Sequence, residues 1–147
     1  MTMTPQPMRL DIMIDYAMRF VGVPYIWGGA HPQQGFDCSG LVQEALASVG
    51  LDPPGDQTAA SLYDALKVSA FQPIENPTRG ALLFFGSPKL SHVAIALSQH
   101  IMIEAGGGGD HTKTVAGAIA ARAAVRLRPI ESRTDLKFML IADRFFI

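Results

Sequence analysis

The sequence predicts an α+β fold, in which N-terminal helices pack on an antiparallel sheet of about five strands, within a single domain that spans residues 1–147. Two observations lead to this prediction. In the first half of the chain, apolar residues recur every three or four positions, which is typical of amphipathic helices. After residue 80 the apolar runs are short and separated by glycine, serine, proline or glutamine, which is typical of strands. Helices followed by strands favour α+β over alternating βαβ units.

Three helices are expected in the first half. The apolar spacing predicts a first helix over residues 10–21 and a second over Cys38–Val49. Asp37 is a plausible N-cap of the second helix, because its carboxylate can accept a hydrogen bond from an unpaired backbone N–H. After a turn, Asp56 is expected to cap a short third helix that ends near Leu66.

Five apolar segments of the second half predict the strands. The first three follow one another with short turns between them, and we expect them to pair antiparallel. The fourth alternates apolar and arginine side chains. We interpret the arginines at 122, 126, 128 and 133 as the solvated face of a strand rather than as phosphate contacts. The segments are 81–85, 92–97, 101–105, 124–130 and 138–142.

The composition fits one buried core and argues against several kinds of partner. Hydrophobic residues make up 48% of the 147 residues and charged residues 17%, so a disordered chain is not expected. The formal net charge is −1, which gives no bulk attraction to nucleic acid or to anionic lipid. No apolar run approaches the roughly 18 residues of a membrane span. We therefore expect neither nucleic acid nor membrane as a partner, and the oligomeric state is not predicted.

The single cysteine, Cys38, lies where the second helix begins, directly after a glycine-rich loop. The unpaired N–H groups and the dipole at a helix N-terminus favour an anion, so a thiolate there is expected to have a lowered pKa. The same N–H groups can hydrogen-bond an oxyanion that forms beside the sulfur. The pattern predicts a nucleophile. The alternative that Cys38 is a small core residue on the apolar face of its helix stays open.

A nucleophilic cysteine needs a base, and His92, which opens the apolar strand SHVAIAL, is the best placed of the four histidines. The next segment, IMIEA, carries Glu104 as its only polar residue. If the two strands form a hairpin centred on residue 98, His92 and Glu104 become cross-strand neighbours, and the carboxylate can orient the imidazole. The alternative that Glu104 is a solvated acid at a strand end stays open.

Together these motifs resemble the NlpC family of cell-wall cysteine peptidases, which have a papain-like fold. The resemblance rests on PYIWGG, GFDCSGLV, RGALLFF and SHVAIAL followed by MIEA, in this order over roughly residues 10 to 105. It implies a peptidoglycan hydrolase that cleaves a stem peptide through a thioester, commonly between D-glutamate and the diamino acid. In this sequence it implies Cys38 as nucleophile, His92 as base and Glu104 as the third residue, where the family often has histidine.

The resemblance also implies a substrate-binding subsite. Tyr25 corresponds to a tyrosine that lines the site near the nucleophile, and Asp37 and Ser39 correspond to positions that help to bind the free amino end of the peptide. A carboxylate and a hydroxyl are chemically suited to an ammonium group. Two departures from the family pattern leave the substrate preference open: Gly80-Ala81 replaces the usual Gly-Asp, and the third residue is an acid, which favours a charged imidazolium more strongly.

No cofactor and no metal are expected. The sequence has no H-E-x-x-H motif, and one cysteine with scattered histidines is poor metal spacing. GGGGDHTKT lacks the ending of a phosphate-binding loop. Two other functions stay open, namely an amidase or acyltransferase that uses the same Cys-His dyad, and a non-catalytic peptidoglycan-binding module.

The first 20 residues lack a basic leader, and Asp11 and Asp15 interrupt their apolar positions, so we expect no signal peptide and synthesis in the cytoplasm. Action on the cell wall then requires delivery, by phage lysis, a phage tail or effector secretion. A phage-encoded origin is an expectation by analogy with the family.

Overall fold

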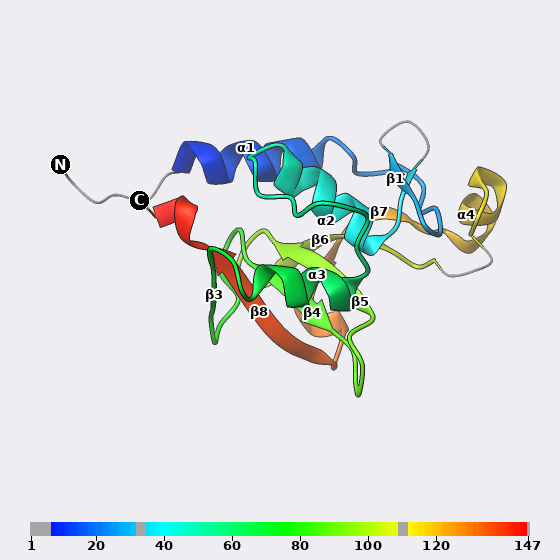
Figure 1. Ribbon diagram of the computed structural model, residues 1–147. Coiled ribbons are helices and arrows are strands. Elements are labelled where there is room, and N and C mark those ends of the chain that lie inside the picture. Colours follow the sequence, from blue (N-terminus) through cyan, green and yellow to red (C-terminus); the bar gives the residue numbers. More distant parts are fainter. Residues whose placement is uncertain (1–6, 32–34, 109–111, 147) are drawn as a thin grey trace.

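The computed structural model describes residues 7–31, 35–108 and 112–146 (Figure 1). Its helices are α1 (Pro7–Met18), α2 (Cys38–Ala47), α3 (Ala59–Leu66) and α4 (Val115–Ala121), with short 3-10 helices η1 (Ile130–Ser132) and η2 (Asp143–Phe146). Its strands are β1 (Ala30–His31), β2 (Gly35–Phe36), β3 (Phe71–Pro73), β4 (Leu82–Phe85), β5 (His92–Ala96), β6 (Ile101–Gly106), β7 (Ala124–Pro129) and β8 (Leu136–Ala142).

Within the described part of the chain, six strands form one antiparallel sheet in the order β3-β8-β4-β5-β6-β7. This confirms the predicted α+β fold with one strand more than expected. The additional strand, β3, has three residues and a single buried side chain, Phe71, so its sequence is too short to show an alternation. The last strand, β8, returns to the interior of the sheet and pairs with both β3 and β4.

The core lies between the sheet and the N-terminal helices. Figure 1 shows α1 and α2 side by side along one side of the sheet, and α2 packs directly on β5. The apolar side chains of α2 that face the sheet, Leu41, Val42 and Leu46, have no exposed surface. Every residue of β4 and β5 is buried, so the middle of the sheet is covered on both faces. This packing makes the start of α2 and the start of β5 rigid neighbours.

The helix boundaries show which capping predictions were right. Asp37 is the N-cap of α2, and its side chain accepts a hydrogen bond from the N–H of Gly40 at 2.7 Å, as predicted. The prediction that Asp56 caps the third helix was wrong. Thr58 is the N-cap, because it forms a reciprocal capping box with Ser61.

Helix α4 was not predicted from the sequence. Its residues, VAGAIAA, are mostly small and show no clear apolar period, so only Thr114 as N-cap indicates a helix start. The first helix also begins and ends three residues earlier than expected, at Pro7 and Met18. Among the described residues, no helix is long and apolar enough to span a membrane.

Candidate active site

Cys38 is the first residue of α2 and is 9% exposed. Its sulfur lies within hydrogen-bonding reach of backbone N–H groups of Val93, Ser39 and Cys38 itself. Burial nevertheless raises the pKa of the Cys38 thiol to about 11, and the charge of Asp37 adds to the effect. The expectation of a lowered pKa was therefore wrong, because desolvation outweighs the N–H groups at the helix start. The thiol is protonated at neutral pH and needs a base to react.

His92, the predicted base, is the first residue of β5 and is 8% exposed. Its Nε2 lies 2.9 Å from Oε1 of Glu104. This hydrogen bond fixes the ring orientation and leaves Nδ1 as the nitrogen that can accept the thiol proton. His92 and Cys38 line one cavity of about 190 Å³, and Val93, whose N–H approaches the sulfur, directly follows His92 in the chain. The structure thus brings the predicted nucleophile and base into the same pocket.

The hairpin register differs from the predicted one by two residues. Ile95 pairs with Ile103 and Ala96 with Met102, so the hairpin is centred on residue 99 rather than 98. His92 and Glu104 are therefore diagonal neighbours and not directly opposite. A shift of two residues keeps both side chains on the same face of the sheet, and long side chains reach across a diagonal. The predicted contact forms even though the predicted register was wrong.

Glu104 is a buried ion-pair partner and not a solvated acid, since its side chain is 2% exposed. Its Oε2 accepts a hydrogen bond from Nε of Arg126 at 3.0 Å and lies 3.9 Å from Nη1 of Arg128. Burial alone raises the pKa of Glu104, but the hydrogen bond and charge of His92, followed by those of Arg126, outweigh it and hold the pKa at about 2. Glu104 is thus ionised throughout the neutral range.

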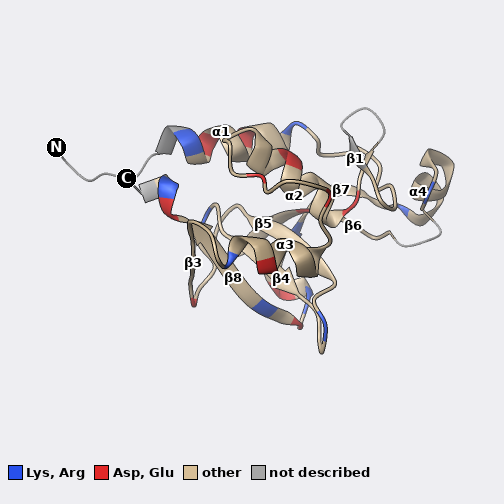
Figure 2. Cartoon of the chain, viewed as in Figure 1, with Lys and Arg blue, Asp and Glu red and all other residues tan. Residues whose placement is uncertain are grey.

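The interpretation of the strand arginines as a solvated face was therefore wrong for two of them. β7, which carries Arg126 and Arg128, runs beside β6, which carries Glu104 (Figure 2). Both guanidinium groups line the cavity of Cys38, as does Arg133 from the segment that follows η1. The alternation of apolar and basic residues correctly predicted the strand but could not tell which surface the basic face lines.

A second cavity, of about 310 Å³, shares Cys38 with the first and gathers the predicted substrate-binding residues Tyr25, Asp37 and Ser39. Ser39 Oγ donates to Oδ1 of Asp37 at 3.4 Å. Burial raises the pKa of the Asp37 carboxyl, and the charge of Asp56 adds to the effect. Burial likewise raises the pKa of Tyr25, whose phenol is therefore a neutral hydrogen-bond donor.

Two residues of this second cavity were missed by the sequence analysis. Asp56, which was expected to cap a helix, lines the cavity together with Asp37. Trp27 lines both cavities and is 51% exposed. Because Thr58 takes the capping role, Asp56 is available to the cavity. The PYIWGG motif was a signal for Trp27, but an isolated Asp in a turn gives no such signal.

The glycines at the end of β6 and directly after it are required by close packing. A Cβ atom on Gly106 would collide with the carboxylate of Glu104, and one on Gly108 would collide with the ring of Tyr25. One on Gly107 would press against Nη1 of Arg126 at 3.1 Å. These glycines let the chain pass beside the site, which the sequence alone did not indicate.

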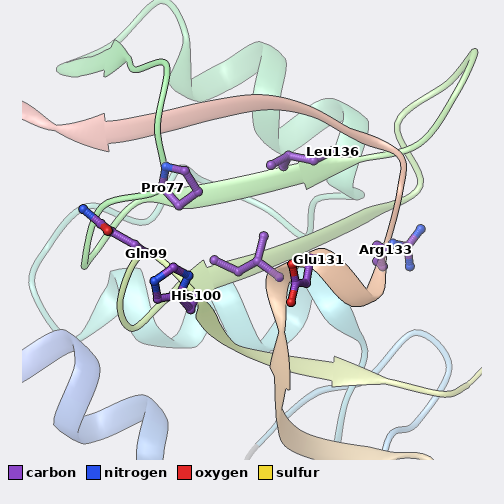
Figure 3. A pocket seen from close by; sticks show the side chains of 7 residues that line it. Pro77, Gln99, His100, Glu131, Arg133 and Leu136 are labelled. Atoms are coloured by element: carbon purple, nitrogen blue, oxygen red, sulfur yellow. The ribbon is translucent and has the colours of Figure 1, made fainter.

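Another cavity, of about 290 Å³, holds none of the predicted site residues (Figure 3). It shares Arg133 with the cavity of Cys38 but is otherwise lined by residues of other segments: Pro77, Gln99, His100, Ile130, Glu131 and Leu136. Within residues 7–31, 35–108 and 112–146, no group of three or more His, Cys, Asp or Glu side chains could hold a metal ion. Among the described residues, the predicted catalytic groups therefore meet only in the cavity of Cys38.

A model of the NlpC/P60 family matches residues 22–128, nearly three quarters of the chain. The chain belongs to the NlpC/P60 family. The matched residues contain every predicted site residue, and the fold agrees with solved structures of the family. The structure of the peptidoglycan hydrolase RipB from Mycobacterium tuberculosis superposes with a TM-score of 0.69 at 25% identity, covering 97% of this chain and 67% of that one.

Curated relatives in this family include peptidoglycan endopeptidases. The bifunctional muramidase/DL-endopeptidase CwlT of Bacillus subtilis is 36% identical over 103 residues, which cover 67% of this chain and 30% of CwlT. RipB of M. tuberculosis is 37% identical over 113 residues, covering 67% of this chain and 44% of RipB. The NlpC/P60 chain therefore matches less than half the length of these relatives. RipD of M. tuberculosis, described as a non-catalytic NlpC/p60 domain protein adapted to peptidoglycan binding, superposes with a TM-score of 0.66 at 25% identity, covering 92% of this chain and 97% of that one.

Proposed function

We propose that this NlpC/P60 domain is a cysteine endopeptidase that hydrolyses stem peptides of peptidoglycan, at the bond between D-glutamate and the diamino acid. The observation that carries the proposal is the buried hydrogen bond of 2.9 Å between His92 and Glu104, in the cavity that also holds Cys38. The relatives named as peptidoglycan endopeptidases support the same substrate class.

The geometry supports a thioester mechanism. Sγ of Cys38 attacks the amide carbonyl carbon while Nδ1 of His92 takes the thiol proton, and N–H groups beside the sulfur stabilise the oxyanion. The imidazolium then protonates the leaving nitrogen as the C–N bond breaks. In the second half, His92 removes a proton from water as it attacks the thioester, and the thiol regains a proton when it leaves. Glu104 stays ionised and stabilises the imidazolium in both halves.

In this proposal the free amino end of the peptide binds in the cavity of Asp37 and Ser39. Two carboxylates, Asp37 and Asp56, line that cavity, and an ammonium group would offset their mutual repulsion. This acidity favours a peptidase over an acyltransferase for apolar acyl groups. A role limited to binding, as described for RipD, is less favoured here because Cys38, His92 and Glu104 line one cavity.

Delivery to the cell wall, by phage lysis, a phage tail or effector secretion, stays part of the proposal.

The proposed bond is tested with a synthetic peptide that ends in D-glutamyl-diaminopimelate. We expect the wild-type protein to release free diaminopimelate, detected by chromatography, and Cys38→Ala to release none. A folded wild-type protein that leaves this bond intact while cleaving another bond of peptidoglycan would contradict the assigned bond.

A further inference from the structure

The two cavities that share Cys38 differ in charge. This difference can orient the peptide substrate in the site. The cavity of Asp37 is lined by two acidic side chains and no basic one, whereas the cavity of His92 is lined by three arginines and one acid: Arg126, Arg128, Arg133 and Glu104. Elsewhere acidic and basic residues are spread over the elements without one large block of either sign (Figure 2). The concentration of guanidinium groups beside the reacting atoms therefore calls for an explanation.

The leaving group must lie on the basic side. In the proposed mechanism His92 protonates the leaving nitrogen, so the residue that carries this nitrogen has to sit against the imidazole. His92 lines the arginine cavity and does not line the cavity of Asp37. The acyl part of the substrate then occupies the acidic side and the leaving residue the basic side.

Protein carboxylates match the charge of Arg133 but only part of the charge of Arg126 and Arg128. Arg133 forms two hydrogen bonds with Asp135, at 2.9 and 2.8 Å, so its charge is matched. Arg126 and Arg128 share the single carboxylate of Glu104, which also serves His92. Two guanidinium groups thus face one carboxylate.

Arg126 and Arg128 both line the cavity and keep hydrogen-bond donors that have no acceptor among the described residues. Arg126 uses only Nε on Glu104, and among the described residues its two Nη groups have no hydrogen-bond acceptor. The closest contact of Arg128 with Glu104 is 3.9 Å, beyond hydrogen-bond distance, and its side chain is 36% exposed. Gly106 and Gly107 leave the room that the Arg126 guanidinium occupies. A planar fork of N–H donors matches a carboxylate.

We propose that Arg128, together with the Nη groups of Arg126, forms an anion subsite that binds a free carboxylate on the leaving residue of the substrate. This inference rests on the proposed function, because it takes the orientation of the peptide from it. It identifies the preferred substrates as peptides whose leaving diamino acid carries a carboxylate on its side chain, rather than an amine alone.

The test compares two peptides that differ only in this carboxylate, with diaminopimelate or lysine after D-glutamate. Calorimetric titration of the full chain carrying Cys38→Ala measures binding without turnover. We expect the diaminopimelate peptide to bind roughly 10–100-fold more tightly, the effect of one or two charge-assisted hydrogen bonds. Adding Arg128→Gln should reduce this ratio to within a few fold.

The matched control is Arg144→Gln, which removes an exposed arginine of η2 that lines neither cavity and should keep the ratio. If Arg128→Gln does not fold, Arg128→Lys keeps the charge without the fork and should give an intermediate ratio. Equal binding of the two peptides, or an unchanged ratio in both Arg128 variants, overturns the anion subsite. Hydrolysis by the wild-type protein is measured separately, so carboxylate-dependent binding without cleavage would contradict the peptidase and uphold the subsite.

Discussion

The carboxylate of Glu104 divides its two oxygens between partners of different kinds. Oε1 holds the imidazole of His92 and Oε2 holds the guanidinium of Arg126. An acid in this place can orient the ring and stabilise its charged form, which a neutral third residue does only in part. The arginine limits this effect, because it competes for the same negative charge. The buried acid that takes the place of the family's usual histidine is therefore accommodated by Arg126 on β7.

Replacement of Glu104 by glutamine tests this orienting role. Glu104→Gln should lower kcat by roughly 10–100-fold, because the amide can still accept from Nε2 but no longer stabilises an imidazolium. His92→Ala should cost more, roughly 10²–10⁴-fold, because it removes the base itself. Steady-state kinetics on the same peptide, with circular dichroism to verify folding, compares them. A loss in Glu104→Gln as large as that in His92→Ala would contradict a merely orienting role.

The pKa of Glu104 also predicts how stability depends on pH. Its folded pKa of about 2 lies below the ordinary value of 4.5, so its contribution is complete above pH 4.5 and is lost as the pH falls toward 2. The loss is on the order of 3 kcal/mol. Urea unfolding at pH 6 and pH 3 should therefore show a larger drop in unfolding free energy for wild type than for Glu104→Gln. Equal drops in both proteins would show that the ion pair does not contribute in this range.

At the scale of elements, the start of α3 separates a structural role from a binding role. Thr58 and Ser61 close the capping box, whereas Asp56 takes no part in the cap and lines the cavity with Asp37; Thr58 also lines this cavity. The predicted cap, Asp56, and the observed cap, Thr58, lie two residues apart. Thr58 is the cap because Ser61, at the third helical position, accepts a hydrogen bond from the backbone N–H of Thr58. The usual capping box has glutamate or glutamine at this position, so the sequence did not indicate it.

Substitutions at these two residues should therefore affect different properties, stability in one case and peptide binding in the other. Thr58→Ala should lower the unfolding free energy by about 1 kcal/mol, because it removes the cap. Asp56→Ala should leave stability nearly unchanged but raise KM for a peptide with a free amine more than for its N-acetylated form. Denaturant unfolding and steady-state kinetics measure the two effects. A stability loss in Asp56→Ala matching that of Thr58→Ala would reinstate Asp56 as the cap.

For the whole molecule, the sequence predicted local features better than long-range ones. The α+β order, the start of α2 and the strands β4 to β7 followed from apolar spacing and from Asp37 as a cap. The register of the β5–β6 hairpin, the place of β8 between β3 and β4, and the surface faced by the β7 arginines did not. These depend on which elements meet in space, and one strand's pattern does not contain that information. That the chain forms a single domain stays a prediction.

The position of β8 makes a prediction about the extent of the folding unit. The family match ends at residue 128, yet β8 lies between β3 and β4 and buries Leu140, Ile141 and Ala142. A chain truncated after residue 128 should therefore lose cooperative thermal unfolding, because β3 and β4 lose their shared partner. Phe138→Ala in the full chain is the control, since Phe138 is 38% exposed and its loss should leave the fold intact. A cooperative transition in the truncated chain would show that β8 is dispensable.

Digestion of purified peptidoglycan tests the central claim most directly, with wild type, Cys38→Ala and His92→Ala compared side by side. The soluble fragments are analysed by mass spectrometry, and the folding of each protein is verified by circular dichroism. A thiol endopeptidase predicts new stem-peptide ends with wild type and none with Cys38→Ala. No release by folded wild type from several wall chemistries, or equal release by Cys38→Ala, would contradict the claim.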